Sequence, residues 1–238
     1  MKMSAARKRL ALICVAALVT VIVCNYPCTY RVGVNGKVST KKIPLYAKAC
    51  GFLYRDWAYR DVVSSVIGPG RKNDTEKALA ILKWTNDNVM SRVPDGVKVV
   101  DDHPLNIIIR QYGAGDQVED VFTILCSYAG MPAGMVRCYN AARNASRNLS
   151  VVLVDGRWLI FNAGKGKYFL NKAGRIGSIE DYKNGQIELS AQDEAVYKEY
   201  LDDLKTLDPD SFTRPDEQMP MRRIPAEIRK AIYRFRGK

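Results

Sequence analysis

The spacing of the apolar residues changes at Gly130, near the middle of this chain. Before Gly130, apolar side chains such as Val118, Val121 and Leu125 recur every three or four residues, which is the period of an amphipathic helix. After Gly130, short apolar segments are separated by turn residues, which is the pattern of strands. A chain whose helices precede its strands predicts an α+β fold, with helices packed on an antiparallel sheet.

Three helices are predicted before this change. Residues 55–67 form a short amphipathic helix that ends at a Gly-Pro-Gly turn. The second helix starts near Asn73, whose side chain can cap it, and continues to Val89. The third begins at Asp116 and ends where Gly130 supplies the residue that follows many helices in the left-handed conformation.

The second half of the chain predicts strands and two further helices. The predicted strands are residues 133–139, 149–154 and 157–161. Asp155-Gly156 joins the last two and is a strong hairpin signal. Residues 163–167 contain two glycines but lack the spacing of a phosphate-binding loop, so they predict a turn. Residues 194–207 predict a helix on the surface, and residues 224–238 predict a basic helix that begins near Pro225.

The N-terminal segment has the layout of a membrane-entering sequence. Lys2 and the basic residues 7–9 precede the run Leu10 to Cys24, which carries no charge. Because no pair of small residues marks a cleavage site, we expect residues 1–27 to form an uncleaved signal anchor, that is, a transmembrane helix. A cleaved signal peptide is the alternative. In either case the remainder lies outside the cytoplasm, in the periplasm or the extracellular space.

These patterns divide the chain into four segments. They are an anchor at residues 1–27, a linker with a short extended region at 28–54, a folded domain at 55–190 and a basic helical extension at 191–238. The formal net charge of +12 suits an anionic partner, and the C-terminal helix is a candidate for contact with anionic lipid. No nucleic-acid-binding fingerprint accompanies the charge, so we do not expect that partner.

The cysteines and the histidine limit the chemistry further. Disulfides persist outside the cytoplasm, and Cys28 with Cys50 is the pairing to test, although the sequence leaves it open. His103 is the single histidine, and there is no Cys-x-x-Cys, so too few ligands exist for a zinc site. We expect neither a structural metal nor a cofactor.

One stretch of motifs resembles the transglutaminase-like superfamily. Tyr112-Gly-Ala-Gly-Asp-Gln corresponds to the family's Gly-Trp-Cys-Asp-Gln turn, and Gly130-Met-Pro-Ala-Gly corresponds to the Gly-Ile-Pro-Ala-Arg-like end of its helix. Residues 83–88 resemble the preceding helix, and residues 154–162 resemble the strand with an Asp-Gly turn, a Trp and a closing Asp. The resemblance covers about residues 55–170 and implies a papain-like α+β core.

The same resemblance implies that the catalytic triad is degenerate. The family uses a Cys at a helix N-terminus, activated by a His that an Asp orients. The Cys position is Gly115 here, the His position is about Asn148, and the Asp position is Asn162. No Ser, Thr or Cys occurs between Ile109 and Val121. The resemblance therefore implies a non-catalytic domain.

Two functions follow from a degenerate site. In the first, the cleft binds a peptide or a glycan, or scaffolds partner proteins at the cell envelope. The residues expected to line that cleft are Tyr112, Asp116, Gln117, Trp158 and Asn162. In the second, the chain is an active cysteine acyl-transferase or protease-like enzyme with a relocated nucleophile, Cys126 or Cys138. Cys126 lies on or beside the apolar stripe of its helix, so we expect it to be buried and inert.

Overall fold

The computed structural model describes residues 5–34, 37–70, 72–99, 101–140 and 144–206, and the single residues 219, 225, 229, 232 and 233. Most of the basic C-terminal helix predicted from the sequence lies outside these residues. The helices are α1 (Ala5–Cys24), α2 (Leu45–Ile67), α3 (Asp74–Asn88), α4 (Pro104–Arg110), α5 (Gly115–Tyr128), α6 (Ile179–Lys183) and α7 (Ala191–Leu204). The strands are β1 (Pro27–Val34), β2 (Lys37–Pro44), β3 (Ala133–Asn140), β4 (Ala145–Val154), β5 (Arg157–Asn162), β6 (Lys167–Tyr168), β7 (Leu170–Asn171) and β8 (Ile187–Glu188).

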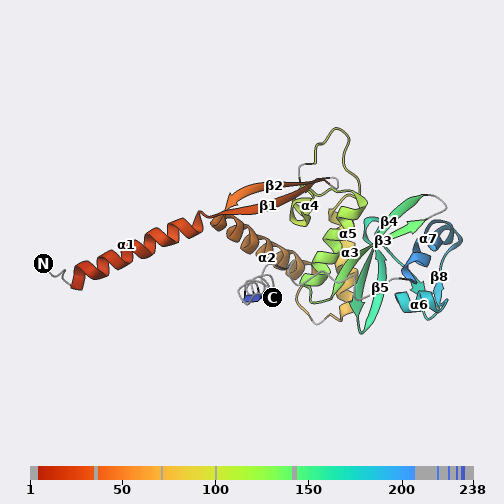
Figure 1. Ribbon diagram of the computed structural model, residues 1–238. Coiled ribbons are helices and arrows are strands. Elements are labelled where there is room, and N and C mark those ends of the chain that lie inside the picture. Colours follow the sequence, from red (N-terminus) through yellow and green to blue (C-terminus); the bar gives the residue numbers. More distant parts are fainter. Residues whose placement is uncertain are drawn as a thin grey trace.

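The centre of the domain is an antiparallel sheet in the order β3-β4-β5-β6 (Figure 1). The β4–β5 hairpin turns at Asp155 and Gly156, whose φ values are 49° and 76°. Two successive residues with positive φ form the turn that matches the right-handed twist of paired strands. The predicted hairpin is therefore present, and the fold is α+β as the helices-then-strands order indicates.

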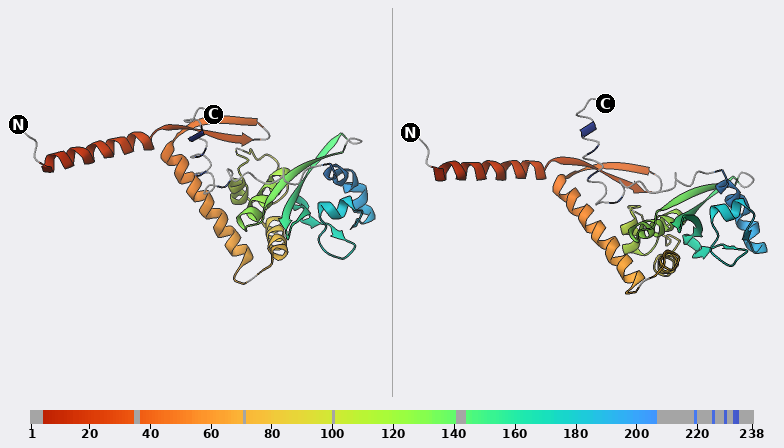
Figure 2. Two further views of the ribbon diagram at one scale, coloured as in Figure 1. Left: turned by 60° about the horizontal axis from the view of Figure 1, so that its bottom comes forward. Right: turned by 90° about the horizontal axis from the view of Figure 1, so that it is seen from below.

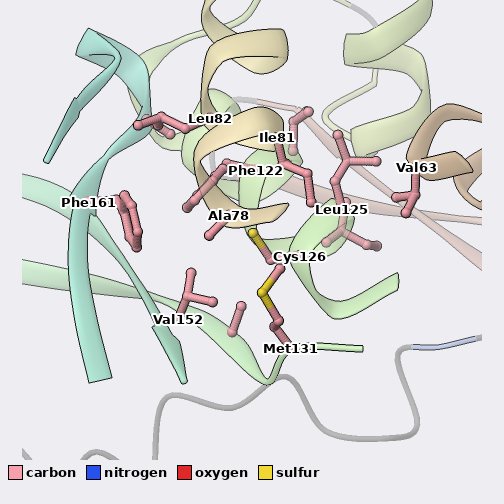
Figure 3. Packing of buried hydrophobic residues seen from close by; sticks show 14 of the residues in the cluster. Val63, Ala78, Ile81, Leu82, Phe122, Leu125, Cys126, Met131, Val152 and Phe161 are labelled. Carbon is pink, nitrogen blue, oxygen red and sulfur yellow. The ribbon is translucent and has the colours of Figure 1, made fainter. Parts of the chain in front are cut away.

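Helix α5 packs against one face of this sheet and is the most buried helix of the domain. Its apolar side chains Phe122 and Leu125 meet Val152 and Phe161 of the sheet in a shared core (Figure 3). The Phe122 and Phe161 rings lie with their centroids 5.2 Å apart. The Asn73 side chain caps α3, as the sequence predicts, and forms a capping box with Glu76. Helix α3 packs against α5.

The opposite face of the sheet is covered by α6 and α7. Trp158 and Ile160 of β5 share a second core with Leu201 and Leu204 of α7. The sequence predicted a surface helix over residues 194–207, and α7 is such a helix: one face is exposed, and its apolar residues form a stripe at helical spacing that is buried against the sheet. The members of that stripe are Tyr197, Tyr200, Leu201 and Leu204. The sheet is thus sandwiched between helices.

The region before the domain differs from the predicted linker. Residues 27–44 form the antiparallel hairpin β1–β2, and α2 runs from Leu45 to Ile67, well before its predicted start at residue 55. The apolar spacing did not reveal the first half of α2, because side chains such as Leu53 and Tyr54 are exposed. From the C-terminal end of α1, the hairpin and α2 diverge toward the domain (Figure 2).

Helix α1 occupies the segment predicted as a membrane anchor. Among the described residues, no helix has both the length and the hydropathy that crossing a membrane requires.

The cysteines are all free thiols, including Cys28 and Cys50. The disulfide considered for this pair is not formed. Cys28 lies in β1 and Cys50 lies in α2, so they belong to two elements that the sequence alone did not place.

Because helices cover both faces of the sheet, shortening a buried side chain of α7 should strongly lower the stability of the domain. Leu201 is fully buried, so Leu201→Ala leaves a cavity and should lower the free energy of unfolding by about 2–5 kcal/mol. Glu199→Ala on the exposed side of the same helix should change it by less than about 0.5 kcal/mol. Urea unfolding followed by tryptophan fluorescence measures both. Equal effects of the two substitutions would mean that α7 does not pack on the sheet.

Candidate functional site

The three positions predicted for the degenerate triad line one cleft. Gly115 at the start of α5, Asn148 in β4 and Asn162 at the end of β5 all border a cavity of about 230 Å³. The strands bring the two asparagines to the N-terminal end of α5, where the family places its thiol chemistry. The three positions that the resemblance predicts therefore lie together at one cleft.

Gly115 has room for a side chain. A Cβ built on it would have Ser91 Oγ as its nearest neighbour, at 4.0 Å. The adjacent helix start is fixed by Gln117, whose Oε1 accepts a hydrogen bond from the Ala114 backbone N–H at 3.0 Å. Crowding therefore does not explain the glycine at this position.

Gly164 closes the floor of the cleft against Gly115. A Cβ on Gly164 would lie 3.0 Å from Ser91 Oγ, 3.6 Å from Glu119 Oε1 and 3.6 Å from Gly115 Cα. These contacts leave little space for any side chain at residue 164. Ser91, Glu119 and Gly115 therefore meet around one point, although they come from separate parts of the chain.

Glu119 is a buried carboxylate in this floor, one helical turn beyond Gly115. It accepts hydrogen bonds from the backbone N–H groups of Ala163 and Gly164, at 3.0 and 2.9 Å, and from the Ser150 hydroxyl. Burial raises the pKa of Glu119 to about 7, while these donors and the Arg147 charge act in the opposite direction. Near neutral pH its proton is therefore easily gained or lost.

Charged and amide groups surround the opening. Asp116, Arg147 and Lys165 line the cleft. The Arg147 guanidinium lies over the rings of Tyr197 and Tyr200, at 4.8 and 5.3 Å, and is held against α7 by these contacts. Asn162 Nδ2 donates to the Tyr197 hydroxyl at 3.1 Å. The cleft is polar, with both signs of charge and fixed hydrogen-bonding groups.

The residues predicted to bind ligand separate into two groups. Asp116 and Asn162 line the cleft, whereas Gln117, Tyr112 and Trp158 do not. Gln117 is buried, where it accepts from Arg110 and donates to Asp102 at 2.7 Å, so it has a structural role.

Tyr112 and Trp158 point to other parts of the domain. The Arg110 guanidinium lies over the Tyr112 ring at 5.3 Å, on the side of α4. Trp158 is buried in the second core, beneath α6 and α7. Neighbours along β5 explain this position, because Leu159 and Phe161 face α5 and the alternate residue Trp158 faces away. The placement of these two aromatic residues in the cleft is therefore corrected.

Neither cysteine proposed as a relocated nucleophile reaches the cleft. Cys126 is fully buried among apolar side chains (Figure 3), and burial raises its thiol pKa well above the ordinary value. Cys138 lies in the second core, where burial raises its pKa to about 12. A thiol that remains protonated at neutral pH is a poor nucleophile.

Six residues of the cleft were not identified from the sequence: Ser91, Glu119, Ser146, Arg147, Gly164 and Lys165. Glu119 carried a usable signal, because it stands four residues after Gly115 and must share its helix face. Ser91, Arg147 and Lys165 come from a loop, a strand and a turn, and no local pattern relates them to Gly115. Their place follows only from the tertiary fold.

Comparison with known proteins agrees with the motifs. Residues 62–163 match the model of the transglutaminase-like superfamily, which confirms the family predicted from the sequence: this region is a transglutaminase-like domain. No curated protein matches the chain.

Two solved structures are similar to part of the chain. One is a candidate cysteine protease from Cytophaga hutchinsonii, with 18% identity and a TM-score of 0.39, covering 50% of this chain and 42% of that one. The other is a candidate protease from Parabacteroides distasonis, with 13% identity and a TM-score of 0.37, covering 57% and 35%. This chain thus spans less than half the length of either structure.

The raised pKa of Glu119 predicts a pH dependence of stability. Because the folded-state pKa lies near 7 and the unfolded value near 4.5, the folded state binds the extra proton between these limits. Stability should therefore fall as pH rises from about 4.5 to 7, by at most about 1.4 kcal/mol per pH unit. Glu119→Gln should remove this slope, whatever its effect on stability at one pH. Urea unfolding across this range measures it, and equal slopes in both proteins would contradict the assignment.

The cleft geometry also predicts the behaviour of an introduced thiol. Gly115→Cys should fold, because the site has room, and adding Asn148→His should lower the apparent pKa of that thiol by about one unit or more through an imidazolium–thiolate pair. The pH dependence of iodoacetamide labelling, resolved by peptide mapping from the native cysteines, measures the difference. Indistinguishable pH profiles would show that residues 115 and 148 do not face one another.

Proposed function

We propose that this chain is a non-catalytic transglutaminase-like domain whose degenerate cleft binds a peptide. The observation that carries the proposal is the position of Gly115, which begins α5 at the border of a cleft that Asn148 and Asn162 also line. The cleft of the family persists, while none of these three side chains can form a thiolate, accept a proton as imidazole does, or hold a negative charge beside it.

The chemistry of the lining favours a peptide. Asn148 and Asn162 offer amides that match the donors and acceptors of a peptide backbone, and Ser91 and Ser146 add hydroxyl groups. Arg147 and Lys165 can pair with an acidic side chain or a terminal carboxylate, and Asp116 can pair with a basic one. A glycan would use the hydroxyl and amide groups but leave these charges unmatched.

The alternative of an active enzyme has less support. Cys126 and Cys138 lie in two different cores, and burial raises the pKa of each thiol. Neither is next to a histidine, since the single histidine, His103, caps α4. No observation favours thiol chemistry elsewhere in the described part of the chain.

The test is a substitution that fills the cleft. The probe is an array of short synthetic peptides, followed by fluorescence polarisation with the best binder. Gly115→Leu should fold normally, because a Cβ there has space, and should weaken binding at least tenfold, equal to about 1.4 kcal/mol.

Gly33→Leu is the matched control, because a Cβ on Gly33 has no atom within 4 Å and Gly33 lies in β1, outside the cleft. Its affinity should equal that of the unsubstituted protein. Undiminished binding by Gly115→Leu would overturn the proposed site. Peptide cleavage or ammonia release by the unsubstituted protein would overturn the non-catalytic role, and preferential binding of oligosaccharides would replace the peptide.

A further inference from the structure

A second and larger cavity lies between the β1–β2 hairpin, α2 and α4. Its volume is about 880 Å³, within the range of small-molecule sites. Much of its wall comes from β1, β2 and the first half of α2, which precede the family region at residues 62–163. Figure 2 shows the hairpin and α2 diverging at this place. The cavity is therefore separate from the cleft at Gly115.

The charges that line this cavity are of one sign. Arg31 of β1 and Lys48 and Arg55 of α2 border it, and none of its described lining residues is acidic. Within the described residues, no carboxylate forms an ion pair with any of these three cations. Cations gathered without counter-charges create a positive potential that favours an anionic ligand.

Contacts within the protein orient two of these cations. The Lys48 ammonium donates to the Thr29 backbone carbonyl at 2.9 Å and so links α2 to the hairpin. The Arg55 guanidinium lies 4.8 Å from the centre of the Phe52 ring. Arginine presents a planar set of donors that matches phosphate oxygens, and stacking on a ring leaves its edge available for such bonds.

The remaining wall is largely apolar. Ile43, Ala47, Phe52 and Ile124 line the cavity beside the cations. A site of this composition suits a ligand that has an anionic head and an apolar body. A simple inorganic ion would leave most of the volume and the apolar wall unused.

We propose that this cavity binds an anionic phosphate monoester with an apolar chain, with Arg31, Lys48 and Arg55 contacting the phosphate. The shared chemistry is the phosphate group, which a lipid or a soluble phosphorylated compound can supply. The site does not depend on the function of the cleft, so either proposal can fail alone.

The test compares three soluble probes by isothermal titration calorimetry with the full chain. They are short-chain phosphatidic acid below its micelle concentration, glycerol 3-phosphate and short-chain phosphatidylcholine. Phosphatidic acid should bind at least tenfold more tightly than either of the others. If glycerol 3-phosphate binds equally tightly, the site is one for soluble phosphates, and the proposed role of the apolar wall is overturned. Equal binding of phosphatidylcholine would overturn the role of the cations.

Paired variants locate the binding site. The double variant with Arg31→Gln and Arg55→Gln should bind phosphatidic acid at least tenfold more weakly. The matched control is Lys37→Gln with Lys41→Gln, which removes the same charge from exposed positions of β2 outside the cavity and should leave affinity unchanged. Circular dichroism melts verify that each variant is folded. Equal loss in the two pairs would show that net charge alone attracts the probe and would overturn the site.

Discussion

The buried carboxylate of Glu119 joins the parts of the molecule that form the cleft. A carboxylate removed from water is costly unless donors satisfy it, and here three donors do so. They belong to Ser150 of β4 and to Ala163 and Gly164 after β5, while Glu119 itself belongs to α5. One side chain thus fixes a helix, a strand and a turn together. Because Gly164 is held in this way, it closes against Gly115, and the position of the cleft floor follows.

The sequence was informative where short-range physics determines the structure. The α5 stripe, the Asn73 capping box and the Asp155-Gly156 turn each depend on residues a few positions apart, and all three are present. The sequence was uninformative where contacts between residues far apart in the chain determine the structure. Leu53 and Tyr54 are exposed on the first half of α2, so no buried stripe marked that half of the helix. The burial of α7 depends on a sheet face formed by much earlier residues.

The same distinction explains the outcome for the site. Gly115, Asn148 and Asn162 were located through an ordered set of motifs, which encodes the tertiary relation between α5 and the sheet indirectly. Trp158 belongs to the same motif, yet it lies in the second core, because a one-residue step along a strand reverses the face. The residue types in a motif therefore do not determine which of its side chains reach the cleft.

Helix α5 contributes to both cavities without joining them. Glu119 borders the cleft, whereas Ile124, nearer the other end of the helix, borders the larger cavity lined by Arg31, Lys48 and Arg55. Five residues separate them, which places their side chains on different sides of a helix with 3.6 residues per turn. Most of the surface of α5 is committed to packing, since its buried residues include Val118, Phe122 and Leu125. Different elements therefore complete the two sites around α5. The cleft is completed by β4 and the turn after β5, and the larger cavity is completed by the β1–β2 hairpin and α2.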